Sequence, residues 1–208
     1  MSSSRAAAGG EGGRAGASAG SRSGSGTPAG GAKAPDKRRL ILDAAVRVFA
    51  RQGFHACRVS DIADEAGVAY GLVYHYFQSK DQVLDTLFLQ RWDVLLEAIR
   101  ETDARAIPAR EKLEAIAGFI VDSYRHDPDL MKVIIVEVTR AANSFGAAHL
   151  ADITLAYGLI GGIVDQAQRD GQFRPEISAE FAAQAFYGAI EQVLTGWIFG
   201  VVDEDDGA

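Results

Sequence analysis

The residues of this sequence best suited to chemistry lie between positions 70 and 80. They bring together three tyrosines, a histidine, a glycine, a leucine and a lysine: Tyr70, Gly71, Leu72, Tyr74, His75, Tyr76 and Lys80. Aromatic hydroxyls can bond phosphate oxygens, and a glycine lets another molecule approach the backbone closely. The chemistry that this run predicts is the binding of phosphate groups.

Two short helices must position these side chains. The apolar residues of the first recur at i, i+3, i+4 and i+7, as Val59, Ile62, Ala63 and Ala66. Gly67 ends that helix because the residue after a helix often adopts the left-handed backbone that favours glycine. A second helical pattern begins around Ala69 with Val73 and Phe77 on its inner side. This is the pattern of a helix-turn-helix, whose second helix enters the DNA major groove. The alternative is a pair of core helices with packed tyrosines.

The charge distribution is compatible with DNA binding, although the formal net charge is −7. Residues 36–80 carry seven Lys and Arg against five Asp and Glu, and residues 1–35 carry four against one. Residues 81–208 carry ten against twenty-two. The positive charge therefore gathers around the helix-turn-helix, while the acidic remainder is held away from phosphates.

Composition also bears on the compartment. The single cysteine, Cys57, excludes an internal disulfide and indicates a reducing environment. We interpret it as a small buried residue, with a redox sensor as the alternative. The N-terminus lacks the apolar segment of a secretory signal, and no apolar run reaches ~20 residues. We therefore expect a soluble, cytoplasmic protein without a membrane partner.

The chain divides into three parts by composition. Residues 1–35 are rich in Gly, Ser and Ala, so we expect a disordered tail. Residues 36–80 are predicted to form a three-helix DNA-binding domain whose first helix is capped by Asp36. Lys37 and Arg38 lie in its first turn, where the helix dipole disfavours cations. They indicate an anionic partner, with ordinary solubilising charge as the alternative.

Residues 81–208 are predicted to form a second all-helical domain, which binds a ligand and dimerises. A long helix from Ser79 to Glu101 links the two domains, and Ser79 with Gln82 is a capping-box pair. Further helices are expected over 108–126, from 128, over 149–170 and over 178–200.

The last two of these helices suggest a homodimer interface. Gly158 and Gly162 lie inside a helix, where each costs ~1 kcal/mol relative to Ala unless close approach of another helix offsets it. The final helix is apolar around most of its circumference. Phe186, Ile190 and Trp197 are therefore predicted to face a second subunit, because one core would not accommodate all three.

A catalytic function has little support in the sequence. There is no Gly-rich phosphate loop, no pair of metal-ligand cysteines and no nucleophile elbow. His126 with Asp127 and Asp129, or His149 with Asp152, is interpreted as capping and solvation at helix ends rather than as a metal site. We expect no enzymatic activity, no metal and no cofactor.

Residues 37–84 resemble the N-terminal domain of the TetR family of bacterial transcriptional regulators. The shared features stand in order: Ile-Ala at 62–63, Ala-Gly-Val at 66–68, Gly-x-x-Tyr-x-Tyr-Phe at 71–77, and the following lysine. The resemblance implies a two-domain helical homodimer that represses transcription until a small molecule binds its C-terminal domain. The residues then expected at the DNA are Lys37, Arg38, Ser60, Ala69, Tyr70, Gly71, Leu72, Tyr74, His75, Tyr76 and Lys80, with Tyr74, Tyr76 and Lys80 mainly on phosphates.

Two positions depart from the family pattern. Ala69 stands where the family usually has Ser or Thr, and Arg58 stands where it often has Thr. Loss of a hydroxyl cap can cost ~1 kcal/mol. Other groups must therefore cap these helices.

The stretches DGQFRPEIS and FYGAIEQVLTGWI resemble family members that respond to long-chain acyl-CoA and control fatty-acid degradation. An acyl chain needs a long apolar cavity between helices. The predicted lining residues, for which plain core positions are the alternative, are Phe119, Tyr124, Met131, Phe145 and Tyr157. A drug-efflux regulator that responds to aromatic compounds, and a helical interaction protein that does not bind DNA, remain open alternatives.

Overall fold

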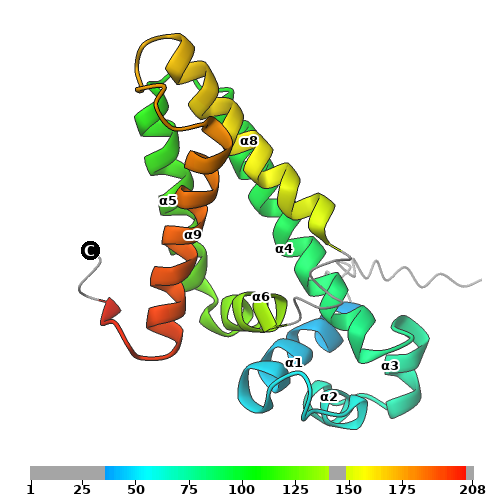
Figure 1. Cartoon of the computed structure of the whole chain (residues 1–208). Coiled ribbons are helices and arrows are strands. Elements are labelled where there is room, and N and C mark those ends of the chain that lie inside the picture. The colour runs from blue at the N-terminus through cyan, green and yellow to red at the C-terminus, as the bar shows by residue number, and fades with distance from the viewer. Residues whose placement is uncertain (1–35, 141–148, 205–208) are drawn as a thin grey trace, which may run out of the picture. The chain divides into compact units, whose positions relative to one another are not determined.

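The computed structural model describes residues 36–140 and 149–204, and in this part of the chain the regular elements are helices. They are α1 (Lys37–Gln52), α2 (Val59–Ala66), α3 (Tyr70–Tyr76), α4 (Lys80–Asp103), α5 (Ala109–His126), α6 (Pro128–Arg140), α8 (Leu150–Arg169) and α9 (Ala179–Ile198) (Figure 1). The predicted all-α class is confirmed for these residues. The predicted tail, residues 1–35, lies outside them.

Side-chain and backbone caps fix the starts of the helices. The Asp36 carboxylate accepts from the Arg38 amide at 3.0 Å, and the Ser79 hydroxyl accepts from the Gln82 amide at 3.1 Å. The Gln82 side-chain oxygen accepts from the amide of Gln78 at 2.6 Å, one residue before the cap. The predicted pairing of Ser79 with Gln82 thus forms, in a slightly extended version of the capping box.

Two apolar cores organise these helices. The first is enclosed by α1, α2, α3 and the first turns of α4, and we call residues 36–80 the head. Its most deeply buried side chains include Ile41, Val48, Phe49, Ile62, Val73, Phe77 and Leu84. The second core lies between the rest of α4 and α5, α6, α8 and α9. It includes Phe88, Ile99, Ile116, Ile160 and Leu194.

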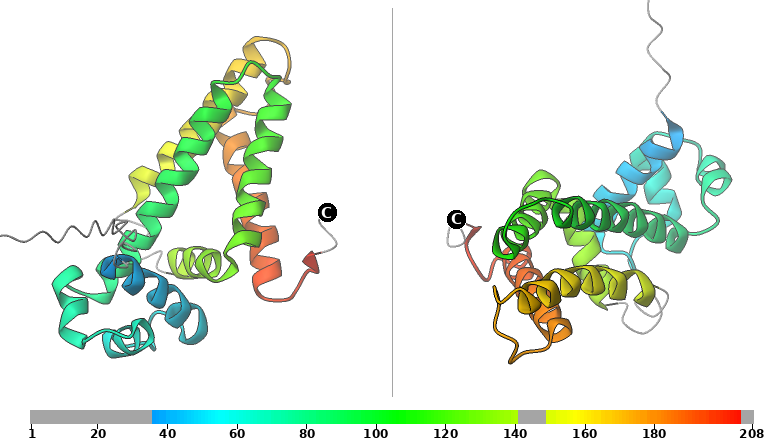
Figure 2. Two further views of the ribbon diagram at one scale, coloured as in Figure 1. Left: turned by 180° about the vertical axis from the view of Figure 1, so that it is seen from behind. Right: turned by 90° about the horizontal axis from the view of Figure 1, so that it is seen from above.

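Two helices belong to both cores. On α4, Leu87 is buried in the head core while its neighbour Phe88 is buried in the second core. On α6, Val133 is buried in the head core, and Leu130 packs against both. Figure 2 shows α4 running from the head along α8, and α6 lying between α1 and the α5–α9 pair. A displacement of either helix is therefore felt in both cores.

The described residues belong to one compact unit, in which the head and the second core are packed together. The domain boundary predicted at residue 80 falls at the start of α4, a helix whose side chains enter both cores. The boundary itself stays a prediction.

The final helix corrects part of the sequence interpretation. Trp197 is buried in its own subunit's core, with its ring 5.5 Å from that of Tyr124. Phe186 and Ile190 are half-buried and pack against the same core. The argument that one core would not accommodate all three side chains is therefore wrong, because α5, α6 and α8 all pack against α9. Its exposed side carries, among others, Phe181, Ala185, Gly188, Ala189, Gln192 and Val193.

Candidate nucleic-acid interface

The inner side of helix α3 packs in the head core, and its outer side is exposed to solvent. Val73 and Phe77 are almost fully buried in the head core, and the Arg38 guanidinium lies 5.2 Å from the centre of the Phe77 ring. On the outer side, the side chains of Tyr70 and Tyr74 are 54% and 44% exposed. Large aromatic rings this exposed are available to a partner.

The two exposed tyrosines form a donor pair. The Tyr70 hydroxyl donates to the Tyr74 hydroxyl at 3.2 Å, and the rings meet edge to face at 5.1 Å. The hydrogen bond to Tyr74 raises the pKa of Tyr70, so this phenol stays protonated at neutral pH. When Tyr70 donates to Tyr74, the Tyr74 proton is left to donate outward. The pair can therefore present a polarised hydroxyl to an anionic oxygen.

The other predicted contacts of α3 divide by burial. Ala69, Gly71 and His75 are exposed, and a Cβ at Gly71 would meet nothing within 4 Å. Leu72 and Tyr76 are half-buried, and the Tyr76 ring packs against the head core. The structure thus brings the exposed residues onto one outer surface, while Tyr76 contributes to holding the helix.

The basic residues of the head are in different electrostatic situations. Lys37 is exposed at the start of α1, whereas Arg38 is half-buried. Ser60, the predicted DNA contact on α2, is also half-buried. Arg47 and Arg51 both bond the Glu65 carboxylate, at 2.7 and 3.1 Å. These hydrogen bonds lower the pKa of Glu65, which keeps it charged opposite the two cations. Arg47 and Arg51 are thus occupied in fastening α1 to α2.

Lys80 lies differently from what the sequence suggests. Its ammonium donates to the carbonyls of Phe54, Cys57 and His55 at 2.7, 3.1 and 3.3 Å. A phosphate contact for Lys80 stays a prediction, but these internal acceptors compete for the same protons. Sequence reasoning had no signal for them, because the acceptors are backbone atoms.

The two helix starts that depart from the family pattern, those of α2 and α3, differ in how they are capped. The Asp61 carboxylate accepts from the Arg58 amide at 2.8 Å, which supplies a cap for α2. Ala69, at the start of α3, has no side-chain cap. One of the two missing hydroxyls is therefore replaced by a neighbour and the other is not.

Three of the five predicted effector residues belong to the second core or pack against it. Tyr124 and Met131 are buried, and Phe119 is half-buried against the second core. The half-buried Tyr157 ring meets that of Tyr187 at 5.5 Å. Phe145 lies outside the described residues. Sequence spacing identifies inner positions, but it does not separate packed positions from cavity walls.

Arg91 is a residue that sequence reasoning missed. It is half-buried on α4, and its guanidinium lies 5.2 Å from the centre of the Phe119 ring. Burial lowers the pKa of Arg91, with Tyr187 and Asp127 opposing that shift. Among the described residues, no carboxylate forms a salt bridge with it. An arginine between Phe88 and Leu95 on the inner stripe was the sequence signal that could have revealed it.

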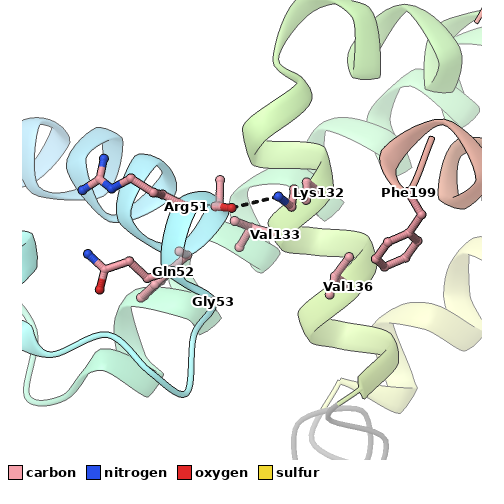
Figure 3. A pocket seen from close by; sticks show the side chains of 9 residues that line it. Arg51, Gln52, Gly53, Lys132, Val133, Val136 and Phe199 are labelled. Carbon is pink, nitrogen blue, oxygen red and sulfur yellow. Dashed lines mark hydrogen bonds between the residues drawn. The ribbon is translucent and has the colours of Figure 1, made fainter.

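A small cavity of about 260 Å³ lies where α1 meets α6 (Figure 3). In it, the Lys132 ammonium donates to the Ala50 carbonyl at 2.9 Å, in the last turn of α1. A cation at this end of a helix is favoured by the dipole. Phe199, after α9, lines the same cavity. A second cavity of about 530 Å³ lies between α5, α8 and α9. Of the predicted effector residues that the structure describes, Phe119, Tyr124, Met131 and Tyr157, none lines either cavity.

Within residues 36–140 and 149–204, no His, Cys, Asp or Glu side chains gather in threes in a way that could hold a metal ion. Of the described helices, none has the length and apolarity needed to cross a membrane.

Comparisons with known proteins bear on both halves of the chain. The family model described as "Bacterial regulatory proteins, tetR family" matches residues 41–87, and that described as "YsiA-like protein, C-terminal region" matches residues 88–204. The chain is 30% identical over 163 residues to the fatty acid metabolism regulator protein of Bacillus subtilis, covering 78% of this chain and 84% of that one. It is 29% identical over 147 residues to the transcriptional repressor KstR2 of Rhodococcus jostii, covering 70% and 72%.

Solved structures agree with these relatives. The fatty acid degradation regulator FadR of Bacillus halodurans superimposes with a TM-score of 0.74 at 29% identity, covering 81% of this chain and 86% of that one. FadR of Bacillus subtilis, in complex with stearoyl-CoA, superimposes with a TM-score of 0.71 at 28% identity, covering 78% and 87%. The chain therefore belongs to the TetR family of bacterial regulatory proteins, and it is a ligand-responsive transcriptional regulator.

Proposed function

We propose that this chain is a repressor that binds a near-palindromic operator as a twofold homodimer and leaves it when a long-chain acyl-CoA binds. The observation that carries the proposal is the continuity of α4. One end of α4 closes the head that displays Tyr70 and Tyr74, and further along it Arg91 lies against Phe119 at the second core. As a regulator of chromosomal genes, the protein would act in the cytoplasm.

The DNA surface of this proposal is the outer side of α3 with the start of α1. Tyr74 and Lys37 would donate to phosphates, and Ala69, Gly71 and His75 would lie next to bases or nearby phosphates. Phosphate contacts position a protein on the duplex, whereas contacts to base edges supply sequence information. The small exposed side chains favour close approach of the α3 backbone to the major groove.

The dimer surface of this proposal is the outer side of α8 and α9. It carries exposed apolar side chains, Leu155, Phe181 and Val193, between residues that are small. A Cβ at Gly158, Gly162 or Gly188 would meet nothing within 4 Å in its own subunit. Their small size is therefore not required by the subunit's own packing, and a second copy that approaches closely would account for it. A twofold dimer would present its α3 helices ~34–36 Å apart, at successive major grooves.

The effector class is supported by chemistry and by similarity. A long-chain acyl-CoA combines an apolar chain with an anionic head. The second core offers aromatic side chains around a half-buried arginine, with Phe119 and Tyr187 near Arg91. FadR of Bacillus subtilis, at 28% identity, has been solved with stearoyl-CoA. We propose that Arg91 neutralises an anionic group of the effector.

Release of DNA requires that the effector binds the two forms of the dimer differently. An acyl-CoA seated beside α4 would favour a position of that helix in which the two heads no longer match the operator. It can do so only by its preference for the released form, and couplings of ~1–3 kcal/mol are typical. The contact between Lys132 on α6 and the end of α1 is a second connection that such a shift would alter.

Fluorescence anisotropy with DNA from the gene's own upstream region tests this function. We expect nanomolar to micromolar operator binding that octadecanoyl-CoA weakens about 5- to 150-fold. Coenzyme A without an acyl chain should have no effect, and Arg91→Gln should require about tenfold more acyl-CoA for the same release. If aromatic compounds release the DNA and no acyl-CoA does, the effector class is wrong while the regulator remains. If no DNA from the gene's neighbourhood is bound, the proposed operator fails.

A further inference from the structure

We propose that residues 199–204, which follow α9, form a strap that holds α6 against the end of α1 and passes the effector signal from the second core to the head. The role of the strap in the signal rests on the proposed function. This route is separate from α4, because it leaves the second core at the end of α9 and reaches the head through α6.

A tight turn after α9 directs the strap back over the last turn of that helix. The Val201 amide donates to the Gly196 carbonyl at 2.8 Å, and the Gly200 amide donates to the Trp197 carbonyl at 3.0 Å. Gly200 has a positive φ of 64°. These are the two hydrogen bonds and the left-handed glycine of a Schellman motif, which reverses the chain at a helix end. The strap therefore leaves α9 in a defined direction.

Gly196 lets the strap lie close against α9. A Cβ at this position would lie 2.9 Å from Cγ2 of Val202. Carbon atoms in favourable contact are about 3.5–4.0 Å apart, so Val202 would have to move. A Cβ at Gly118 on α5, by contrast, would meet nothing within 4 Å. The small size of Gly196 is thus required by the packing of its own subunit, unlike that of the glycines on the proposed dimer surface.

The far end of the strap is attached to α5. The hydroxyl of the buried Tyr124 donates to the Glu204 carboxylate at 3.1 Å. Burial, together with this hydrogen bond, raises the pKa of Tyr124, so the phenol stays protonated and can donate. Loss of the acceptor would take away the partner of a buried hydroxyl, which is costly. The strap is therefore attached to α9 at one end and to α5 at the other.

Between these attachments, Phe199 reaches the helix that contacts the head. It lines the cavity between α1 and α6 together with Val136 and Lys132 of α6 (Figure 3). The Lys132 ammonium in turn donates to the Ala50 carbonyl in the last turn of α1. Because the strap is attached to both α5 and α9, a shift of either helix would move Phe199 and change how α6 lies against α1.

Hydrogen exchange of the effector-free protein tests whether the strap holds α6. Phe199→Ala is the main variant, because a side chain that is 54% exposed can be truncated without opening a core. Gly196→Ala is the second variant, because it displaces Val202. We expect both to raise amide exchange in α6 and in the last turn of α1 about threefold or more, and to leave α3 unchanged. The control variants Val201→Ala, at a strap residue that is 79% exposed, and Gly118→Ala should leave exchange at α6 unchanged.

The signal is tested by two measurements on each variant: the affinity of the free protein for octadecanoyl-CoA, and the factor by which octadecanoyl-CoA weakens operator binding. For the wild type we expect a factor of about 5- to 150-fold. Phe199→Ala should keep acyl-CoA affinity within about twofold and lower that factor about threefold or more. Glu204→Ala, which detaches the strap from α5, should lower the factor in the same way, and Val201→Ala should match the wild type.

Unchanged exchange at α6 and α1 in Phe199→Ala would overturn the strap, and so would a lower melting temperature as the sole change. Raised exchange with an unchanged release factor would overturn its role in the signal. If octadecanoyl-CoA does not release operator from the wild type, the proposed effector fails. The exchange of Phe199→Ala then still decides whether the strap holds α6 against α1.

Discussion

Two surfaces of this protein expose large side chains, and they differ in what those side chains carry. On α3, Tyr70 and Tyr74 are about half exposed and end in hydroxyls that bond each other. On α8 and α9, Leu155, Phe181 and Val193 are similarly exposed but have no polar atom, and they alternate with Gly and Ala. The first surface can donate hydrogen bonds to an anion, whereas the second is stabilised only when another apolar surface buries it.

This difference indicates which partner each surface binds. Exposed hydroxyls remain solvated in the free protein, so they cost little until a phosphate replaces water. An exposed apolar side chain costs roughly 25 cal/mol for each Å² left in water, and it is stabilised by burial against any complementary apolar surface. We therefore expect the outer side of α8 and α9 to determine assembly, and the outer side of α3 to determine affinity for DNA.

A charge placed on the α8–α9 surface gives the largest expected effect. Val193→Glu should separate the dimer, because a carboxylate would be buried in the interface without a partner. Operator affinity should then fall by a factor on the order of 100 or more, since a dimer gains its second half-site at high effective concentration. Sedimentation velocity measures the assembly, and anisotropy measures the DNA binding.

A matched control is available on α4. Val94 is exposed to a similar extent but is not on α8 or α9, so Val94→Glu should leave both assembly and DNA binding intact. A Val193→Glu protein that stays dimeric would remove the outer side of α9 from the interface. Ile190→Glu is a poorer test, because Ile190 packs against its own subunit's core and a charge there should unfold the chain.

Substitutions on the α3 surface should reduce operator affinity less, and the two tyrosines should differ in the size of the loss. Tyr74→Phe removes the hydroxyl that is left to donate outward, and a hydrogen bond to a charged group contributes about 1.5–3 kcal/mol. We expect operator affinity to fall roughly tenfold or more, with similar losses on unrelated DNA. Tyr70→Phe removes only the donor behind it and should cost less. Equal effects of the two changes in anisotropy titrations would contradict the donor order.

The same comparison explains which features the sequence could reveal. The limits of α2 and α3 follow from local signals, such as Gly67 with its positive φ and the inner residues Val73 and Phe77. The class of the fold and the family follow from that short stretch. The acceptors of Lys80 could not be predicted, because they are backbone oxygens 23 to 26 residues away.

The C-terminal half was harder to interpret for a different reason. A helix that is apolar all round does not reveal which side is buried, so Phe186, Ile190 and Trp197 were assigned outward although all three pack inward. Glycines are more informative, since a helical glycine without an internal reason points outward, as Gly158 and Gly162 do. Apolar residues on inner stripes look alike in a core and in a cavity wall, so the role of Tyr124 and Met131 as effector contacts stays a prediction.

The smallest expected effect concerns the start of α3, where the departure from the family pattern is not compensated. Ala69 precedes the helix with an extended backbone (φ −64°, ψ 139°), and no side chain caps the first amides. Ala69→Ser would supply a hydroxyl that can accept from the amide of Gly71 or Leu72, and such caps contribute about 0.5–2 kcal/mol, typically ~1. We expect the melting temperature to rise by about 2–4 °C for a domain of this size. Ala66→Ser, in the last turn of α2 where no cap is needed, is the control and should not stabilise.

Because Ala69 is exposed beside Tyr70, the Ala69→Ser variant also tests whether α3 is already ordered before it meets DNA. If the cap raises the melting temperature and leaves operator affinity unchanged, α3 is fully formed in the free protein. If operator affinity rises together with stability, part of the cost of binding is the ordering of this seven-residue helix.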